Sequence, residues 1–512
     1  MATSKASAMC NNTIEGDTQL KIEIYDITTA DELIDQVLAL GEQASRISSV
    51  FIDMTRYYET LDEAEELADA ARKQLEISAT NKDTSSSPLA RTSVTVTDAS
   101  TLCGPIITLL DLIKTYNGRL TSFTWPAPLL LYRVFTRPQS FWTALYAHAP
   151  TLVTLHLDFF CHEVHTLGPL PPNTAFPLLK TLQLDTSSAH AWNGCNGSTI
   201  DALLHASPHL ESLRFEWPLG DLEHCQLTNI SWAWTFPDLT HLHVCGLNIE
   251  HNHNAYNDFL VRHPGLTSLE ERVDGPYDDE GGKLDARLPA SALPNLHTLI
   301  KAGGSTHPLT DYFDTAANRP IHSLTLHVGS FSGIEQCLPD IVACTPAQTG
   351  LRSLAFRGAI DRWRDSIEAL DSSSDDRTET PAERQIRKEK WAKNREERKK
   401  RRPLTILKKV LPSLLGLEEL DIEMDSSHPS CESSGTWVCP EPMSEVDLRN
   451  VMGALTEGNA RNLRILRMRD TRAKPLQQLG EVLRESEVVT GSLQVVEWCG
   501  EEKSVLRVSQ IE

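Results

Sequence analysis

The feature that most constrains the fold is a leucine spacing that returns about every 28 residues. Its pattern is Leu-x-x-Leu-x-apolar, and between residues 152 and 351 the copies start at nearly even intervals. A repeat of this length supplies one short strand and one return segment, so the core is added unit by unit. The clearest copies are Leu152/Leu155/Leu157, Leu179/Leu182/Leu184, Leu210/Leu213/Phe215, Leu239/Leu242/Val244, Ile321/Leu324/Leu326 and Leu351/Leu354/Phe356.

Further copies lie on both sides of this stretch and in its gaps. Three later ones are Leu417/Leu420/Ile422, Leu463/Leu466/Met468 and Leu493/Val496/Trp498. Weaker ones are Ile47/Val50/Ile52, Leu120/Phe123/Trp125, Leu266/Leu269 and Leu296/Leu299. Proline keeps the same phase and precedes the first leucine by two residues at Pro150, Pro177, Pro208, Pro237, Pro264 and Pro294. Because proline cannot continue a helix, it is predicted to end each return segment just before the strand.

Within each copy the last two apolar positions alternate with period two, which predicts a short strand with those side chains turned inward. The return segments predict amphipathic helices; the first follows the capping box Thr29-x-x-Glu32. We therefore expect an α/β leucine-rich-repeat solenoid, a horseshoe with a parallel concave sheet and convex helices. It is predicted to span residues 20–512 after a disordered tail at 1–19, with insertions near 78–92, 371–403 and 425–445.

The Pro-x-Leu-x-x-Leu-x-Leu style of the repeats resembles the repeat half of fungal F-box proteins. In that family an N-terminal F-box module docks an adaptor of a ubiquitin ligase, and the repeats hold the substrate. The resemblance implies a substrate-recognition subunit with a ligase adaptor among its partners. The chain departs from that family at residues 29–52, which read as a helix and a repeat strand instead of a leucine-proline opening.

Charge and hydropathy narrow the function classes. The 512 residues carry a formal net charge of −22, which opposes binding to nucleic acid phosphates and anionic lipid over the whole surface. No stretch approaches 18 uninterrupted apolar residues, and no secretory signal pattern opens the chain. We expect a cytoplasmic protein, with the nucleus as the alternative, whose eleven cysteines are reduced thiols.

In this frame the side chains between the buried positions line the concave surface that solenoids use for binding. They form columns across successive strands, and we take them as the candidate partner-binding residues. The set is Thr154, His156, Asp158, Thr181, Gln183, Asp185, Ser212, Arg214, Glu216, His241, His243, Glu270 and Arg272.

Three acidic residues of this set, Asp158, Asp185 and Glu216, fall on successive strands about 5 Å apart. Such an acidic stripe could meet lysine or arginine of a partner, or simply be a solvated surface. The Ser/Thr column is open to another interpretation, cross-strand hydrogen bonding. Glu419, Asp421 and Glu423 face Arg467 and Arg469, which predicts a self-neutralised ion-pair ladder.

A basic stretch interrupts the acidic chain. Residues 384–402 hold eleven Lys or Arg against three Glu, a net charge of +8, and end in Lys399, Lys400, Arg401 and Arg402. This segment is either a nuclear-import or nucleic-acid patch or a solvated charged helix.

Ligand and catalytic motifs are sparse. His241, His243 and Cys245 share one predicted strand face, but alternate residues lie about 7 Å apart, so we expect no metal site and no cofactor. No sequence signature of a hydrolase, kinase, metalloprotease or dinucleotide-binding enzyme is present. The sequence predicts a non-enzymatic interaction scaffold or substrate-recognition subunit that binds a basic protein partner on the concave face. The alternatives are an F-box-like ligase receptor and a nuclear nucleic-acid-associated protein.

Overall fold

The computed structural model describes two compact units, Met1–Phe259 and Leu260–Glu512. The described residues are 11–14, 17–23, 30–53, 103–125, 137–159, 168–186, 197–216, 231–245, 253–272, 287–302, 309–314, 319–327, 350–357, 413–423, 448–449, 451–453, 455, 462–469, 493–499 and 503–507. The predicted insertions at 371–403 and 425–445 and the one near 78–92 lie outside them.

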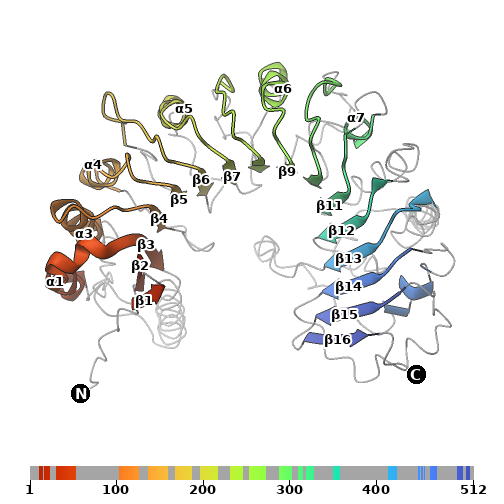
Figure 1. Cartoon of the computed structure of the whole chain (residues 1–512), viewed down its shortest axis with the longest axis horizontal. Helices are drawn as coiled ribbons and strands as arrows, with labels where there is room; N and C mark the ends of the chain where they lie inside the picture. Colours follow the sequence, from red (N-terminus) through yellow and green to blue (C-terminus); the bar gives the residue numbers. More distant parts are fainter. Residues whose placement is uncertain are drawn as a thin grey trace, which may run out of the picture. The chain divides into compact units, whose positions relative to one another are not determined.

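The first unit is built on a sheet whose strands follow chain order (Figure 1). The strands are β1 (Asn11–Ile14), β2 (Asp17–Glu23), β3 (Ile47–Asp53), β4 (Ser122–Trp125), β5 (Thr154–Phe159), β6 (Thr181–Thr186), β7 (Ser212–Glu216) and β8 (His241–Cys245). β1 is antiparallel to β2, and all pairs from β2 to β8 are parallel. Strand structure thus begins at Asn11, inside the stretch for which the sequence predicts a disordered tail.

The register of these strands follows the leucine pattern. Leu155 pairs with Leu182, Leu182 with Leu213 and Leu213 with Leu242, so equivalent positions of successive repeats stand side by side. All four leucines are buried, while the residues between them are at least partly exposed along β7. The predicted strand frame and parallel sheet are therefore confirmed in this unit.

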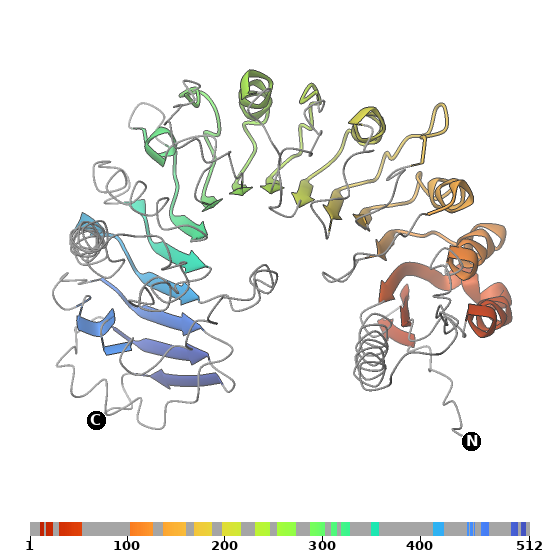
Figure 2. The ribbon, with the colours of Figure 1, turned by 180° about the vertical axis from the view of Figure 1, so that it is seen from behind.

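Helices cover one side of the strands. They are α1 (Ala30–Ala39), the 3-10 helix η2 (Gly41–Arg46), α3 (Cys103–Thr115), α4 (Gln139–Tyr146) and α5 (Gly197–His205), and α6 (His253–Arg262) crosses the boundary between the units. Figures 1 and 2 show α3, α4 and α5 along the same side of the strands. α1 begins one residue after Thr29, as the capping box predicts.

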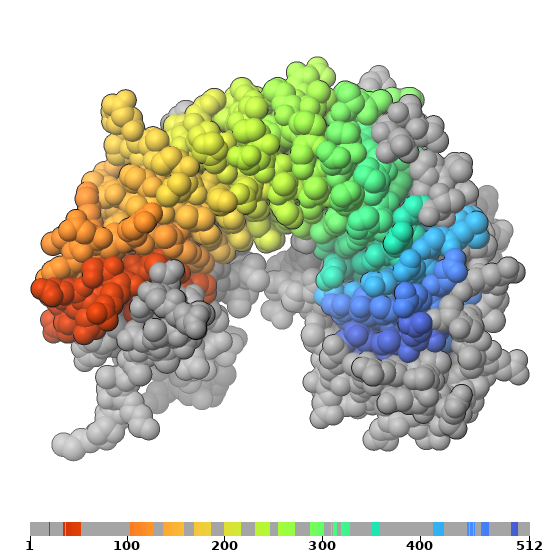
Figure 3. Space-filling model, viewed as in Figure 1, coloured from red at the N-terminus to blue at the C-terminus, as the bar shows by residue number. Residues whose placement is uncertain are grey.

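Aromatic packing joins strand and helix in the core of this unit. The ring of Trp125 in β4 meets Phe141 of α4 edge to face at 5.3 Å between centroids. The guanidinium of Arg137, which is 2% exposed, lies 4.6 Å from the Trp125 ring centre. The electrostatic attraction between a buried cation and the face of an indole ring offsets part of the free energy lost when the cation is dehydrated. In the space-filling view the described parts of the unit, coloured red to yellow-green, pack directly against one another (Figure 3).

Two return segments have a non-helical stretch of described residues directly ahead of their strands. Residues 168–180 before β6 and 231–240 before β8 have no helical turn. Large aromatic side chains fill the space instead: Trp232 and Trp234 pack on Phe259 at 5.3 Å and 6.3 Å between ring centres. An extended segment with aromatic residues can bury enough apolar surface to replace an amphipathic helix.

The second unit has the same plan. Its strands are β9 (Ser268–Arg272), β10 (Thr298–Ala302), β11 (Ser323–His327), β12 (Ser353–Arg357), β13 (Glu419–Glu423), β14 (Ile465–Arg469), β15 (Val495–Cys499) and β16 (Lys503–Arg507). β9 to β15 are parallel and β16 is antiparallel to β15. The short helix α7 (Leu309–Tyr312) follows β10. Both units are thus α/β structures on parallel strands.

A buried ion pair explains why two repeats look weak in the sequence. Glu271 of β9 and Lys301 of β10 stand side by side at the position where other repeats place an apolar residue. They are 0% and 2% exposed, and their charged atoms are 4.0 Å apart. The hydroxyl of Tyr312 in α7 donates to Glu271 at 2.6 Å, and Lys301 Nζ lies 4.5 Å from the Tyr312 ring centre.

Candidate functional site

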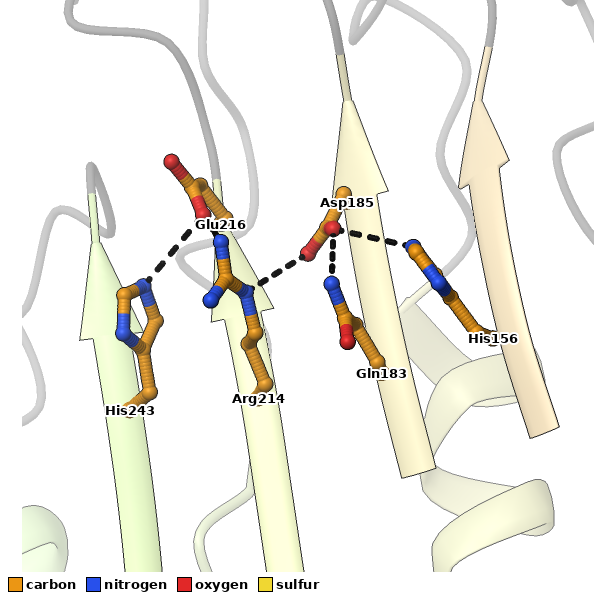
Figure 4. A network of polar contacts seen from close by, with 6 residues as sticks. All are labelled: His156, Gln183, Asp185, Arg214, Glu216 and His243. Carbon is orange, nitrogen blue, oxygen red and sulfur yellow. Dashed lines mark hydrogen bonds and ion pairs between the residues drawn. The ribbon is translucent and has the colours of Figure 1, made fainter. Parts of the chain in front are cut away.

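Polar side chains form a connected network across strands β5 to β8, on the face of the first unit opposite its apolar core (Figure 4). We call this set the β5–β8 network: His156, Gln183, Asp185, Arg214, Glu216 and His243. The parallel register places His156 beside Gln183, Gln183 beside Arg214 and Arg214 beside His243. All six belong to the predicted binding set, and the structure brings them into mutual contact.

Asp185 is the centre of the network. Its carboxylate accepts hydrogen bonds from His156 Nε2 at 3.1 Å, from Gln183 Nε2, and from Arg214 Nε at 3.3 Å. The donors come from three successive strands, β5, β6 and β7. The Asp185 side chain keeps 15% of its surface exposed, so solvent still reaches it. Its position is fixed by three donors, which pre-orients the carboxylate.

Glu216, at the end of β7, forms the second acidic centre. Arg214 Nη2 donates to Glu216 Oε2, and His243 Nε2 lies 3.7 Å from the same oxygen. The Glu216 side chain is 30% exposed and that of Arg214 is 39% exposed. The third acidic residue of the predicted stripe, Asp158, pairs with Asp185 in the register, but its side chain is not among the described ones.

Charge in the network is unbalanced. Two carboxylates, Asp185 and Glu216, share the single guanidinium of Arg214. The two histidines add positive charge only when they are protonated. The carboxylates of the network therefore outnumber its arginine, and both remain partly exposed to solvent.

The column of outward residues at the strand starts, Thr154, Thr181, Ser212 and His241, changes in exposure from one strand to the next. Thr154, Thr181 and Ser212 are half-buried and stand side by side at the starts of their strands. His241 continues the column and is exposed, with its Nδ1 2.8 Å from the hydroxyl of Thr240. His243 shares the solvent-facing side but is only 8% exposed, with its Nε2 3.7 Å from Glu216 Oε2. The sequence pattern does not predict that burial.

The two remaining predicted residues, Glu270 and Arg272, belong to β9 of the second unit. Glu270 is half-buried, and the Arg272 side chain is outside the described residues. Lys399, Lys400, Arg401 and Arg402 also fall outside them, so the basic patch stays a prediction.

A second polar cluster, the β12–β15 ladder, confirms the predicted self-neutralised ion pairs. Arg467 Nη1 is 3.1 Å from Glu419 and its Nε is 3.3 Å from Glu497. Arg469 is 3.0 Å from Asp421, and Glu423 pairs with Arg357 of β12. Burial raises the pKa of Asp421 above its usual value even though three arginines oppose the shift. The ladder thus uses its own cations to satisfy its carboxylates.

Metal-binding side chains meet at one end of the β5–β8 network. One donor atom from each of Glu216, His243 and Cys245 lies within 4.8 Å of the other two. The sequence pattern groups His243 and Cys245 with His241 as possible ligands, whereas the structure brings Glu216, the register partner of Cys245, close to both of them.

No helix among the described residues is long and apolar enough to cross a membrane. The chain matches none of the protein-family models and none of the curated proteins with which it was compared.

Proposed function

We propose that the chain is a non-enzymatic leucine-rich-repeat protein that binds a basic segment of a protein partner on the β5–β8 network. The repeat assignment is supported by three coincident patterns: the period of about 28 residues, the phased prolines and the parallel register of equivalent leucines. In such repeats the strand face is the usual binding surface.

One observation carries the binding proposal. Asp185 and Glu216 are held in place by hydrogen bonds, remain partly exposed and share one arginine. A lysine or arginine of a partner would complete the pairing. Little conformational entropy would be lost on binding, because the carboxylates are already oriented. Complementary charge of this kind mainly accelerates and directs association, so binding should weaken as salt screens it.

The test uses two variants with the same charge change in the same repeats. Asp185→Lys/Glu216→Lys reverses the network, whereas Glu211→Lys/Asp238→Lys reverses exposed acids just ahead of β7 and β8. Tagged wild-type chain and both variants are used to capture proteins from the native cells, and mass spectrometry identifies what each retains. Direct binding of the identified partner is then measured across a salt series.

Partners kept by the wild-type chain and by the Glu211/Asp238 control, but lost from the network variant, would support the proposal. It would be wrong if the network variant retained every partner with unchanged affinity. A basic segment of the partner should crosslink to strands β5 to β8.

The same capture separates the two alternatives. Ligase adaptor subunits among the partners would favour the F-box-like receptor, although residues 30–53 form α1, η2 and β3 and so do not themselves supply the expected module. Neutralising residues 384–402 tests the nuclear role: loss of nuclear localisation or of nucleic-acid binding would favour it.

A further inference from the structure

Three side chains with metal-binding chemistry converge at the ends of two adjacent strands. Glu216 closes β7 and Cys245 closes β8, and the register pairs these two residues. His243 lies two residues before Cys245, so both side chains lie on the same side of β8. Their donor atoms and that of Glu216 all lie within 4.8 Å of one another.

These separations are close to those of a zinc site. Bonds of about 2.0–2.3 Å in a tetrahedron place neighbouring donor atoms about 3.3–3.7 Å apart. His243 Nε2 and Glu216 Oε2 are already 3.7 Å apart. The remaining closure is on the order of 1 Å, which side-chain rotation provides without moving the strands.

The donor types and their surroundings select among cations. A thiolate and an imidazole favour zinc over calcium or magnesium, which prefer oxygen donors. The carboxylate and the thiolate together balance the two charges of the ion. Cys245 is 4% exposed and His243 is 8% exposed, while the Glu216 side chain is 30% exposed, so the fourth tetrahedral position opens toward solvent.

We propose that Glu216, His243 and Cys245 bind a zinc ion, with water in the fourth position. Arg214 donates to Glu216 and is the neighbouring group that orients the ligating carboxylate. This inference goes beyond the proposed partner binding, because the isolated chain should bind zinc without any partner. Glu216 belongs to both proposals, so a partner that is lost from Asp185→Lys/Glu216→Lys but kept by Cys245→Ser would separate partner binding from zinc binding.

The test measures metal binding to the purified full-length chain in the presence of a non-coordinating reductant. Zinc affinity is obtained by competition with a chromogenic chelator, and cobalt serves as a spectroscopic probe whose charge-transfer band reports a thiolate ligand. The site variants are Cys245→Ser, His243→Gln and Glu216→Gln. The matched control is Cys499→Ser, since Cys499 holds the same last strand position in β15; His241→Ala controls for the exposed histidine of β8.

We expect the wild-type chain and both controls to bind one zinc ion and to show the cobalt–thiolate band. Cys245→Ser should lose the band and weaken zinc binding by at least about 100-fold, more than the loss of an outer-shell contact. Glu216→Gln, a change at a partly exposed position that preserves the fold, should weaken it by at least about tenfold.

The proposal is overturned if the wild-type chain binds no zinc, or if Cys245→Ser and Glu216→Gln both bind as the wild type does. Circular dichroism of each variant confirms the fold, and if Cys245→Ser unfolds, Glu216→Gln and His243→Gln decide the outcome.

Discussion

The two units use charge on their strands in opposite ways. In the first unit the inward positions of β5 to β8 are apolar, and the described charged side chains of these strands lie on the outer face, where histidine and arginine partly satisfy two carboxylates. In the second unit an ion pair occupies the core, and the outer ladder is saturated by arginines. Arginine stays charged at any physiological pH, whereas histidine does not.

The stability of the fold therefore depends on the buried charges of the second unit more than on the outer charges of the first. The described core of the first unit rests on aliphatic and aromatic packing and does not use the β5–β8 network, so that network is available for recognition. Glu271 and Lys301 have no such freedom, because each would be a buried unpaired charge without the other.

Lys301→Met should have the largest effect, a loss of about 3–5 kcal/mol in the free energy of unfolding. The change leaves Glu271 buried next to a thioether in place of an ammonium group. Urea unfolding gives the free energy, and hydrogen exchange in β9 and β10 locates the loss in the second unit.

The control removes every charged or polar member of the cluster together. The triple variant Glu271→Leu, Lys301→Met and Tyr312→Phe leaves no buried charge and no unpaired hydroxyl, so its stability should return to within about 1 kcal/mol of wild type or exceed it. A single and a triple variant that lose equal stability would contradict this account.

Lowering the pH should destabilise the first unit through the protonation of His148. Burial, as the main cause, lowers the pKa of His148 below its usual 6.5, and its Nε2 donates to the Leu110 carbonyl at 2.9 Å. Between 6.5 and the lower folded value the unfolded chain binds more protons, so stability falls as pH decreases through this window. His148→Gln keeps a donor for Leu110 and should flatten the stability profile between about pH 7 and pH 5.

Asp421 gives the second unit the opposite dependence. Its pKa is raised by burial above 3.8, so the folded chain binds its proton first and gains stability as pH falls through the raised value. Asp421→Asn should remove that gain and leave the His148 window unchanged. If stability depended on pH in the same way in His148→Gln, Asp421→Asn and the wild type, the opposite pH dependence of the two units would be disproved.

The smallest effects should come from the exposed networks themselves. Arg467→Met leaves Glu419 and Glu497 without their shared cation and should cost about 0.5–1.5 kcal/mol. His156→Ala in the β5–β8 network should change stability by no more than about 0.5 kcal/mol, because Asp185 keeps two other donors. If His156→Ala lost more stability than Arg467→Met, the β5–β8 network would contribute more to folding than the β12–β15 ladder does.

The sequence predicts the strands well because their signal is local. Leucine spacing places every strand from β4 to β8 in its frame, and proline phase supports β5 to β8. The columns of outward residues follow from the period of two. The Glu271–Lys301 pair shows the limit of this reasoning: each residue alone weakens a repeat, and only their adjacency makes the position stable. The non-helical stretch 231–240 escapes prediction for the same reason, since Trp232 and Trp234 pack against α6, a helix of the next repeat.

Contacts between side chains depend on neighbouring repeats in a way that the pattern does not encode. The sequence places Asp185 and Arg214 on the same face, but the sharing of Arg214 between Asp185 and Glu216 requires known rotamers. The approach of Glu216 to Cys245 likewise depends on the register across two strands separated by a long return segment.

The reversed strands β1 and β16 set the strand direction at the two outer edges of the described sheet. A row of parallel strands exposes backbone donors and acceptors at its edges, where a second chain of the same kind could add its own strands in phase and begin a fibre. Here the first unit has the antiparallel strand β1 beside β2, and the second has β16 beside β15. An incoming strand could therefore extend the parallel repeat only by pairing with a strand that runs against it.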